Sequence, residues 1–268
     1  MAKRGMVGVI MRAYGARDHN ATVTRTEMLA PHFVRVHLHS PTLLESAAVA
    51  PAAFLRFWFP DQANPDHEYQ RGYTVSHVDA ATGNFAIDML LHTPEGPASA
   101  WARRAKPGMN VQVTPFGSTH FAPPVDEPRG YLLIGDAAAT PAINAIIAAV
   151  PAQTPIRLYL EQHSSNDRML PLADHPQLQT HWVARDGEAS LAGVIENRDW
   201  TGWYVWATPE SGSLKHVRKK LRDQGGFSRS HRHLQAYWYY GRAFGKHRSL
   251  ATENEQTESG KIHIHDEA

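Results

Sequence analysis

Residues 130–150 read GYLLIGDAAATPAINAIIAAV, and this stretch decides the fold of the second half of the chain. The run 130–135 is short and apolar, which is typical of a buried strand. Over 141–150 the apolar residues recur at helical spacing, so we predict a helix with one buried face. A strand, a loop of small residues and a helix start form the general layout of a nucleotide site at the carboxyl end of a parallel strand.

The alternation of strand and helix continues to about residue 240. We predict further strands at 156–160, 181–184, 203–207 and 234–239, and helices at 190–197 and 209–224. Strands that alternate with helices indicate a parallel α/β sheet.

Before residue 125 the pattern is different, because short alternating or apolar runs are separated by turn residues. Predicted strands are 21–28, 33–39, 54–59, 72–77, 84–91 and 110–115, and one helix, 97–105, starts at a proline after Gly96. This spacing predicts an antiparallel barrel. The predicted fold class is therefore a β-barrel plus an α/β lobe. We expect domains at 1–125 and 126–245 and a disordered polar tail at 246–268.

The composition excludes several classes of function. The 268 residues carry a net charge of +1, so nothing in the overall charge favours nucleic-acid binding. There is no cysteine, which excludes disulfides, thiolate metal sites and iron–sulfur clusters. The 17 histidines are scattered, and we predict no metal site. With no run of 18 apolar residues and no secretory signal, we expect a cytoplasmic chain without a transmembrane segment.

Three segments have side chains suited to a cofactor. In RGYTVS at 71–76, a guanidinium can pair with a phosphate and a phenol can lie along a flavin ring. In HTPEGPASAW at 92–101, the unpaired amides of a helix start favour an anion. The third segment is Gly135-Asp136, which follows neither the dinucleotide glycine fingerprint nor the P-loop pattern. Taken alone, each segment also has a purely structural explanation.

Together and in this order, the segments resemble the siderophore-interacting protein family of FAD-binding ferric-siderophore reductases. The shared pattern is Arg-x-Tyr-Thr at 71–74, Asp-x-x-x-His at 88–92, Gly-Pro-Ala-Ser-x-Trp-Ala at 96–102, Gly-Asp at 135–136, Pro-Ala-Ile at 141–143, Tyr-Trp at 237–238 and Gly-Arg at 241–242. More narrowly, 19–23, 130–135, 159–163 and 196–206 are similar to the N-terminal siderophore-interaction domain of mycobactin-type ABC importers. The resemblance implies a ferredoxin-reductase-like fold.

The resemblance also implies which residues bind FAD. They are Arg71, Tyr73, Thr74, Val75, Ser76, His92, Ala98, Ser99, Trp101, Gly135, Asp136, Tyr237 and Trp238. The flavin would carry the redox chemistry, so no catalytic residue is named. The implied substrate is a ferric siderophore of the mycobactin or carboxymycobactin type, and the implied donor is NAD(P)H or a ferredoxin. A membrane ABC importer is an implied partner, which would place the chain at the inner face of the plasma membrane.

The chain departs from the family pattern at Pro209-Glu210, where many members have Gly-Glu and a small residue, and at two places that concern the cofactor and its reductant. Ser76 stands where a second arginine is common, and Ala137-Ala138-Ala139 stands where the family has Glu-Thr-Ala. One phosphate partner and the groups that would handle a nicotinamide are thus missing. Two alternatives stay open: a general NAD(P)H-dependent flavin oxidoreductase, and an FAD-containing docking module of an importer.

Basic residues near the end of the chain are candidates for a substrate rim. Lys215, Arg218, Lys219, Arg232 and Arg242 could face the carboxylates of a siderophore. The alternative is a solvated helix face, which is the usual role of such a run.

Overall fold

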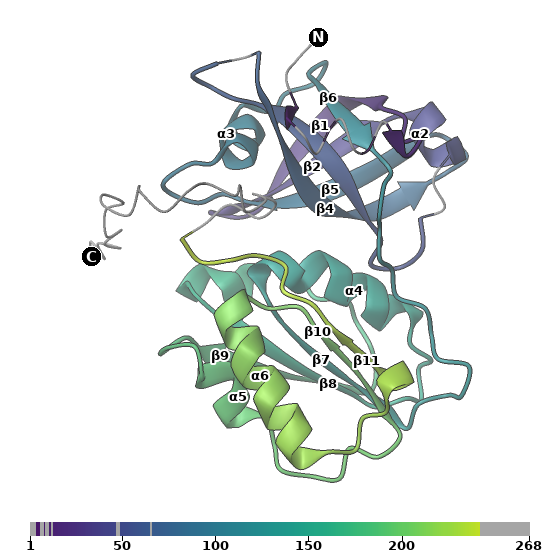
Figure 1. Cartoon of the computed structure of the whole chain (residues 1–268), viewed down its shortest axis with the longest axis vertical. Coiled ribbons are helices and arrows are strands. Elements are labelled where there is room, and N and C mark those ends of the chain that lie inside the picture. Colours follow the sequence, from purple (N-terminus) through teal and green to yellow (C-terminus); the bar gives the residue numbers. More distant parts are fainter. Residues whose placement is uncertain are drawn as a thin grey trace.

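The computed structural model describes residues 4, 5, 8, 11, 13–46, 49–64 and 66–241, which form two lobes (Figure 1). The first lobe is a closed antiparallel barrel with the strand order β1-β2-β5-β4-β3-β6. Its elements are β1 (His19–Ala30), β2 (Phe33–His39), α2 (Pro41–Ser46), β3 (Phe54–Pro60), β4 (Glu68–Asp79), β5 (Asn84–Leu90), α3 (Pro97–Arg104) and β6 (Asn110–Thr114).

Alternating side chains of the strands fill the barrel. In β2, Val36 and Leu38 are fully buried, whereas the residues between and after them are partly or fully exposed. This period of two follows from the pleat of a strand with one face on a core. Helix α3 packs against the barrel, where Trp101 and Phe59 have ring centroids 5.3 Å apart.

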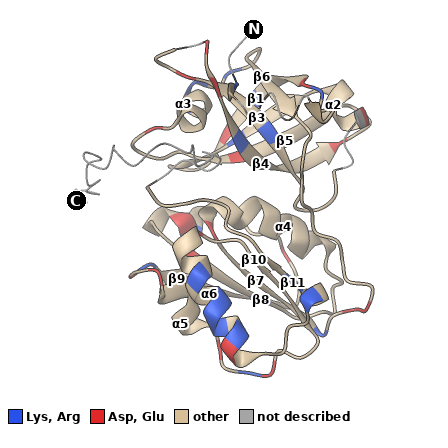
Figure 2. Cartoon of the chain, viewed as in Figure 1, with Lys and Arg blue, Asp and Glu red and all other residues tan. Residues whose placement is uncertain are grey.

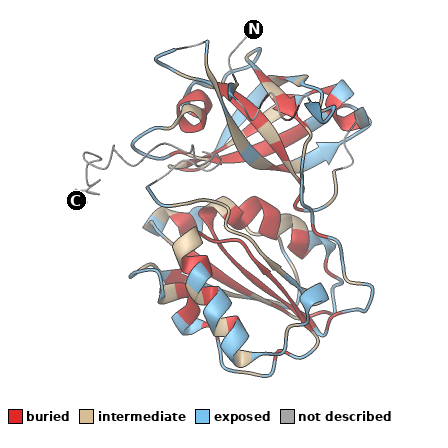
Figure 3. Ribbon diagram, viewed as in Figure 1, coloured by how far each residue is buried: buried red, intermediate tan, exposed pale blue. Residues whose placement is uncertain are grey.

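The second lobe is a parallel sheet of five strands in the order β11-β10-β7-β8-β9. Helix α4 covers one face, and α5 and α6 cover the other, so the three central strands β10, β7 and β8 are buried between two helix layers (Figure 3). The elements are β7 (Gly130–Asp136), α4 (Thr140–Ala149), β8 (Ile156–Gln162), β9 (Leu178–Ala184), α5 (Ser190–Val194), β10 (Trp203–Ala207), α6 (Ser211–Gln224) and β11 (Arg232–Leu234).

The two lobes meet at the turn between β1 and β2. Ala30 and Phe33 of the barrel share an apolar cluster with Ala137 and Leu170 of the second lobe, and α4 lies against β4 (Figure 1). The loop after β7 is part of this contact, so the carboxyl end of β7 faces the barrel. Among the described residues, no helix is both long and apolar enough to cross a membrane.

The predicted barrel and the predicted parallel sheet are confirmed. Three element predictions need correction, and one helix was missed. The predicted helix 190–197 ends at Val194. The predicted strand 234–239 is wrong, since β11 spans only Arg232–Leu234. Its neighbour β10 runs into Pro209, which has no N–H for a sheet ladder. The predicted helix 209–224 starts at Ser211 because the Glu210 side chain caps it. The short helix α2 was not predicted. Arg242 and the predicted tail 246–268 lie outside the described residues.

Candidate functional site

The barrel strand β4 carries a cation without a counter-ion. Arg71 is partly buried, and its Nη1 donates to the backbone oxygen of Gln70 at 2.7 Å. The guanidinium also lies 6.0 Å from the centroid of the Tyr69 ring. Burial lowers the pKa of Arg71, and no carboxylate of the described residues pairs with it. A half-buried guanidinium in this state is well suited to a phosphate, which it can bind through two parallel hydrogen bonds.

Tyr73 lies two residues further along the same face of β4. Its ring meets Phe57 and Phe59 edge-on, with centroid distances of 6.0 and 5.8 Å. Burial raises the pKa of Tyr73 far above its ordinary value, although Arg71 opposes the rise. The phenol therefore stays neutral, and its partly buried ring has a fixed position. Such a ring can serve as a platform for an aromatic cofactor.

Thr74 contributes to a polar group of side chains between the lobes. The Tyr237 hydroxyl interacts with the side chains of Thr74, Trp206 and Thr208. Burial raises the pKa of Tyr237 to about 12, while these three partners oppose the rise. Among the described residues, the buried Trp206 Nε1 and Thr208 Oγ1 find no partner of full hydrogen-bond geometry. Buried polar atoms rarely lack a well-formed hydrogen bond, so these two atoms are candidates to bind a ligand.

The next two residues of β4 direct their polar groups into the protein. The Val75 amide donates to Ala53 at 2.9 Å, and Ser76 Oγ donates to the Ala86 carbonyl at 3.3 Å. A cofactor contact by Val75 or Ser76 stays a prediction.

The start of α3 is fastened to the end of β5. Ser99 Oγ accepts from the His92 amide at 3.1 Å, and the exposed His92 ring lies 2.7 Å from the Pro94 carbonyl through Nδ1. The side chains of Ala98 and Trp101 belong to the barrel core. A phosphate contact by this segment stays a prediction, and it would fall to backbone amides and His92 rather than to the Trp101 ring.

Gly135 and Asp136 end β7 where the chain turns into α4. A Cβ at Gly135 would lie 2.5 Å from the Ala139 Cβ, so only glycine fits this close approach. Asp136 Oδ1 accepts from the Ala138 amide at 3.0 Å, and Oδ2 accepts from the Glu210 amide at 3.0 Å and from Trp238 Nε1 at 2.8 Å. Burial raises the pKa of Asp136, which the charge of His163 and the Trp238 indole oppose. Both oxygens are thus used within the protein.

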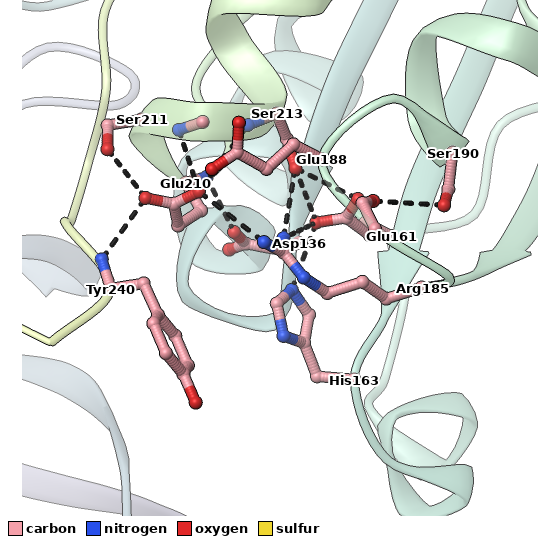
Figure 4. Close-up of polar contacts among 12 residues, drawn as sticks. Asp136, Glu161, His163, Arg185, Glu188, Ser190, Glu210, Ser211, Ser213 and Tyr240 are labelled. Atoms are coloured by element: carbon pink, nitrogen blue, oxygen red, sulfur yellow. Dashed lines mark hydrogen bonds and ion pairs between the residues drawn. The ribbon is translucent and has the colours of Figure 1, made fainter. Parts of the chain in front are cut away.

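A charge network lies beside Asp136 at the carboxyl ends of β8 and β9 (Figure 4). Glu161 is fully buried, and it contacts Arg185 Nη1 at 2.7 Å, His163 Nε2 at 3.1 Å and Ser213 Oγ at 2.9 Å. Burial works against the charge of Glu161, but His163 and Arg185 hold its pKa below the ordinary value. Burial also works against a charged His163, yet Glu161 and Asp136 raise its pKa. The network therefore favours the charged forms of both Glu161 and His163.

The sequence did not single out five residues of this region. They are Glu161, His163, Arg185, Trp206 and Thr208. All lie at or just beyond the carboxyl ends of β8, β9 and β10. Since these ends face the ligand side of an open α/β sheet, their position in the predicted strands was the available signal.

Four of the basic residues proposed as a substrate rim lie within the described part of the chain, away from β4. Lys215, Arg218 and Lys219 are exposed on α6, on the outer face of the second lobe (Figure 2). Arg232 pairs in register with Val205, and Val205 with Leu132. Leu132 is four residues before Asp136, or roughly 13 Å towards the amino ends of the sheet. Arg218, Arg229 and Arg232 line an open surface pocket of about 300 Å³. The structure thus does not bring these residues to β4.

The residues between the lobes fit FAD. Arg71 could bind a cofactor phosphate, Tyr73 offers an aromatic ring, and Trp206 and Thr208 offer buried polar atoms that make no hydrogen bond of full geometry within the described residues. No group of three or more His, Asp and Glu in the described part of the chain is arranged to hold a metal ion.

Comparisons with known proteins agree with an FAD site in this chain. Residues 63–118 match the family model described as "Siderophore-interacting FAD-binding domain", and residues 128–241 match "Siderophore-interacting protein". The crystal structure of the siderophore-interacting protein SipS from Aeromonas hydrophila has the same fold, with a TM-score of 0.73 at 23% identity. That match covers 85% of this chain and 94% of SipS.

Two curated relatives have names that describe their activity. The mycobactin import ATP-binding/permease protein IrtA of Mycolicibacterium smegmatis is 56% identical over 245 residues. This match covers 91% of the chain but only 28% of IrtA. The ferric vibriobactin reductase ViuB of Vibrio cholerae is 24% identical over 258 residues, which is 86% of the chain and 94% of ViuB.

The closed barrel followed by a parallel sheet defines a ferredoxin-reductase-like fold, and the match at 63–118 identifies an FAD-binding domain within it. The chain belongs to the siderophore-interacting protein family.

Proposed function

We propose that this chain binds FAD between its lobes and reduces a ferric siderophore of the mycobactin or carboxymycobactin type, which releases Fe(II). The observation that carries the proposal is the half-buried guanidinium of Arg71 beside Tyr73, which pairs with no carboxylate of the described residues. Both residues lie within the segment that matches the siderophore-interacting FAD-binding model. The relationship to IrtA supports the siderophore class, and the relationship to ViuB supports ferric reduction.

The chemistry requires a change of iron charge rather than destruction of the ligand. A siderophore holds Fe(III) with hard oxygen donors, and Fe(II) has a lower charge and binds such ligands less tightly. FAD, when bound, accepts a hydride and passes on electrons singly. The protein would hold the phosphate with Arg71, fix the ring against Tyr73 and supply polar contacts from Thr74, Trp206 and Thr208.

The donor and the partner are also part of the proposal. We propose that electrons come from NAD(P)H or a ferredoxin, and that the chain acts at the cytoplasmic face of the plasma membrane beside an ABC importer. The similarity to IrtA supports this placement. Since the chain spans 28% of the length of that relative, transport itself is not assigned to it.

An anaerobic titration of the full chain loaded with FAD tests the proposal. Flavin absorbance is recorded before and after addition of NADPH, NADH or dithionite, and ferric mycobactin is then added with a ferrous chelator. We expect the donor to bleach the flavin, and the siderophore to restore it as the ferrous complex forms. One NAD(P)H carries two electrons, so it should yield two ferrous ions.

Each other result points to a different function. A chain that binds no FAD contradicts the proposal. A flavin that reduces dyes and free flavin but not ferric siderophore indicates a general flavin oxidoreductase. A flavin that only dithionite bleaches, and that then leaves ferric mycobactin unreduced, indicates a docking module. Arg71→Gln is the matched variant, since it should lower flavin content without unfolding the barrel.

A further inference from the structure

The chain crosses the carboxyl edge of the second lobe after β11. We call residues 235–241 the C-terminal strap. It follows the turn between β10 and α6 and is bound to it by backbone groups. The hydrogen bonds are Gln235 N to Ala207 O at 3.0 Å, Tyr237 N to Pro209 O at 3.3 Å, Ser211 N to Trp238 O at 3.0 Å and Tyr240 N to Glu210 Oε1 at 3.1 Å.

Asp136 fixes both the strap and the turn. Its Oδ2 accepts from Trp238 Nε1 at 2.8 Å and from the Glu210 amide at 3.0 Å. The carboxylate is 1% exposed, so these bonds form away from water and are charge-assisted. The Ala138 amide donates to Oδ1, so each oxygen of Asp136 accepts at least one hydrogen bond within the protein.

The next residue of the strap lies on the other side. Neighbouring residues of an extended segment point in opposite directions. While Trp238 meets Asp136, the Tyr237 hydroxyl lies near Trp206 of β10 and Thr208 just beyond it, and it reaches Thr74 on β4 of the barrel. Tyr237 is thus a polar link between the strap and the strand of the proposed flavin site.

We propose that Asp136 is a positioning residue: by binding the Trp238 indole it fixes the C-terminal strap, which in turn places the Tyr237 hydroxyl against Thr74 and holds β4 in its cofactor-binding position. This rests on the proposed function for the identity of the cofactor. A direct cofactor contact by Asp136 stays a prediction.

The expected effect follows from the kind of contact. Removing the Trp238 N–H takes away a hydrogen bond to a buried carboxylate. This should lower the exchange protection of the strap and of 72–76, and the affinity for FAD, by about tenfold. Trp238→Phe is the best variant, since it keeps an aromatic ring and leaves Asp136 with two backbone donors. Tyr237→Phe removes only the link to Thr74. Tyr240→Phe is the control, because Tyr240 is exposed and only its backbone amide binds Glu210.

Two measurements on the full chain test the proposal. Hydrogen exchange without FAD reports the protection of 72–76 and of the strap, and fluorescence titration reports FAD affinity. In Trp238→Phe we expect about tenfold faster exchange in both segments and about tenfold weaker FAD binding. Tyr237→Phe should affect 72–76 and FAD affinity alone. The double variant should lose no more affinity than the more affected single variant, because both act on one link.

Other outcomes separate the two proposals. If Trp238→Phe frees the strap but leaves exchange at 72–76 and FAD affinity unchanged, the positioning role is wrong. If the wild-type chain binds no FAD, the proposed function fails, and the exchange of 72–76 in the three variants alone decides the role of Asp136.

Discussion

His32 Nε2 lies 2.6 Å from Asp167 Oδ1 and connects the barrel turn between β1 and β2 to the second lobe. The Asp167 side chain is buried, and its other oxygen accepts from the amides of His163 and Ser164 at 2.8 and 3.0 Å. A single carboxylate thus joins the barrel to the segment that carries His163 of the charge network.

His32→Ala should therefore weaken the contact between the lobes. It leaves a buried carboxylate oxygen without its partner, which should lower the free energy of unfolding by about 1–3 kcal/mol. Urea denaturation measures the change. His39→Ala, at an exposed histidine of β2, is the control. Equal unfolding free energies for the two variants would show that the contact between His32 and Asp167 contributes nothing.

Arg71→Gln should weaken FAD binding by about 10- to 100-fold, because a charge-assisted hydrogen bond to a phosphate contributes about 1.5–3 kcal/mol. A fluorescence titration of the purified full chain measures this. Arg25→Gln is the matched control, since Arg25 is an exposed arginine of the same barrel that pairs with Glu27. If both variants bind FAD as the wild-type chain does, Arg71 is not a phosphate ligand.

The sequence predicted the architecture because each element carries its own periodicity. Six short runs between turn residues gave the barrel, and the 130–150 stretch gave the parallel lobe. The predicted strand 234–239 failed for a specific reason. Its aromatic residues are typical of a strand, but Pro209 ends the ladder on β10, so Tyr237 and Trp238 continue as an irregular strap.

The site was predictable only where its residues share one segment. Arg71 and Tyr73 lie on one strand face, so a motif could identify them. The contact between Trp238 and Asp136 joins residues 102 positions apart. Glu161 and Arg185 meet only because β8 and β9 are neighbours. Such contacts depend on how the strands are ordered in the sheet, which the local pattern does not contain.

Asp88 belongs to the family-like pattern, but the structure gives it a structural role that predicts a large loss of stability. It forms a two-bond ion pair with Arg35, with Nε to Oδ1 at 2.7 Å and Nη2 to Oδ2 at 2.8 Å. The hydrogen bonds that Arg35 donates to Asp88 raise the pKa of Arg35. Asp88→Ala leaves a largely buried guanidinium unpaired and should cost about 3–5 kcal/mol.

Urea denaturation checks this prediction, and Arg35→Met/Asp88→Leu is the matched double variant. Replacing the whole pair by apolar side chains should restore most of the stability. FAD affinity should be the same in the double variant as in the wild-type chain. A marked loss of affinity at full stability would instead make Asp88 part of the cofactor site.

The charge network predicts how stability depends on pH. Burial lowers the pKa of His163, but Glu161 and Asp136 outweigh burial, so this pKa is raised above 6.5 in the folded chain. Its contribution to stability is therefore complete below about pH 6.5 and is lost as the pH rises through the folded-state value. The pKa of Glu161 is lowered below 4.5, so its contribution is present above that value and is lost as the pH falls.

His163→Gln should remove the loss of stability above about pH 6.5, a slope of at most about 1.4 kcal/mol per pH unit for one proton. It should also reduce the loss at acid pH, because Glu161 keeps Arg185 and Ser213 but loses a cation. Urea denaturation from about pH 3 to about pH 9 measures both limbs, with His39→Gln as the control. If the plots of unfolding free energy against pH for the wild-type chain and His163→Gln stay parallel across this range, the pKa of His163 is not raised. Arg185 alone then supplies the positive charge of the network.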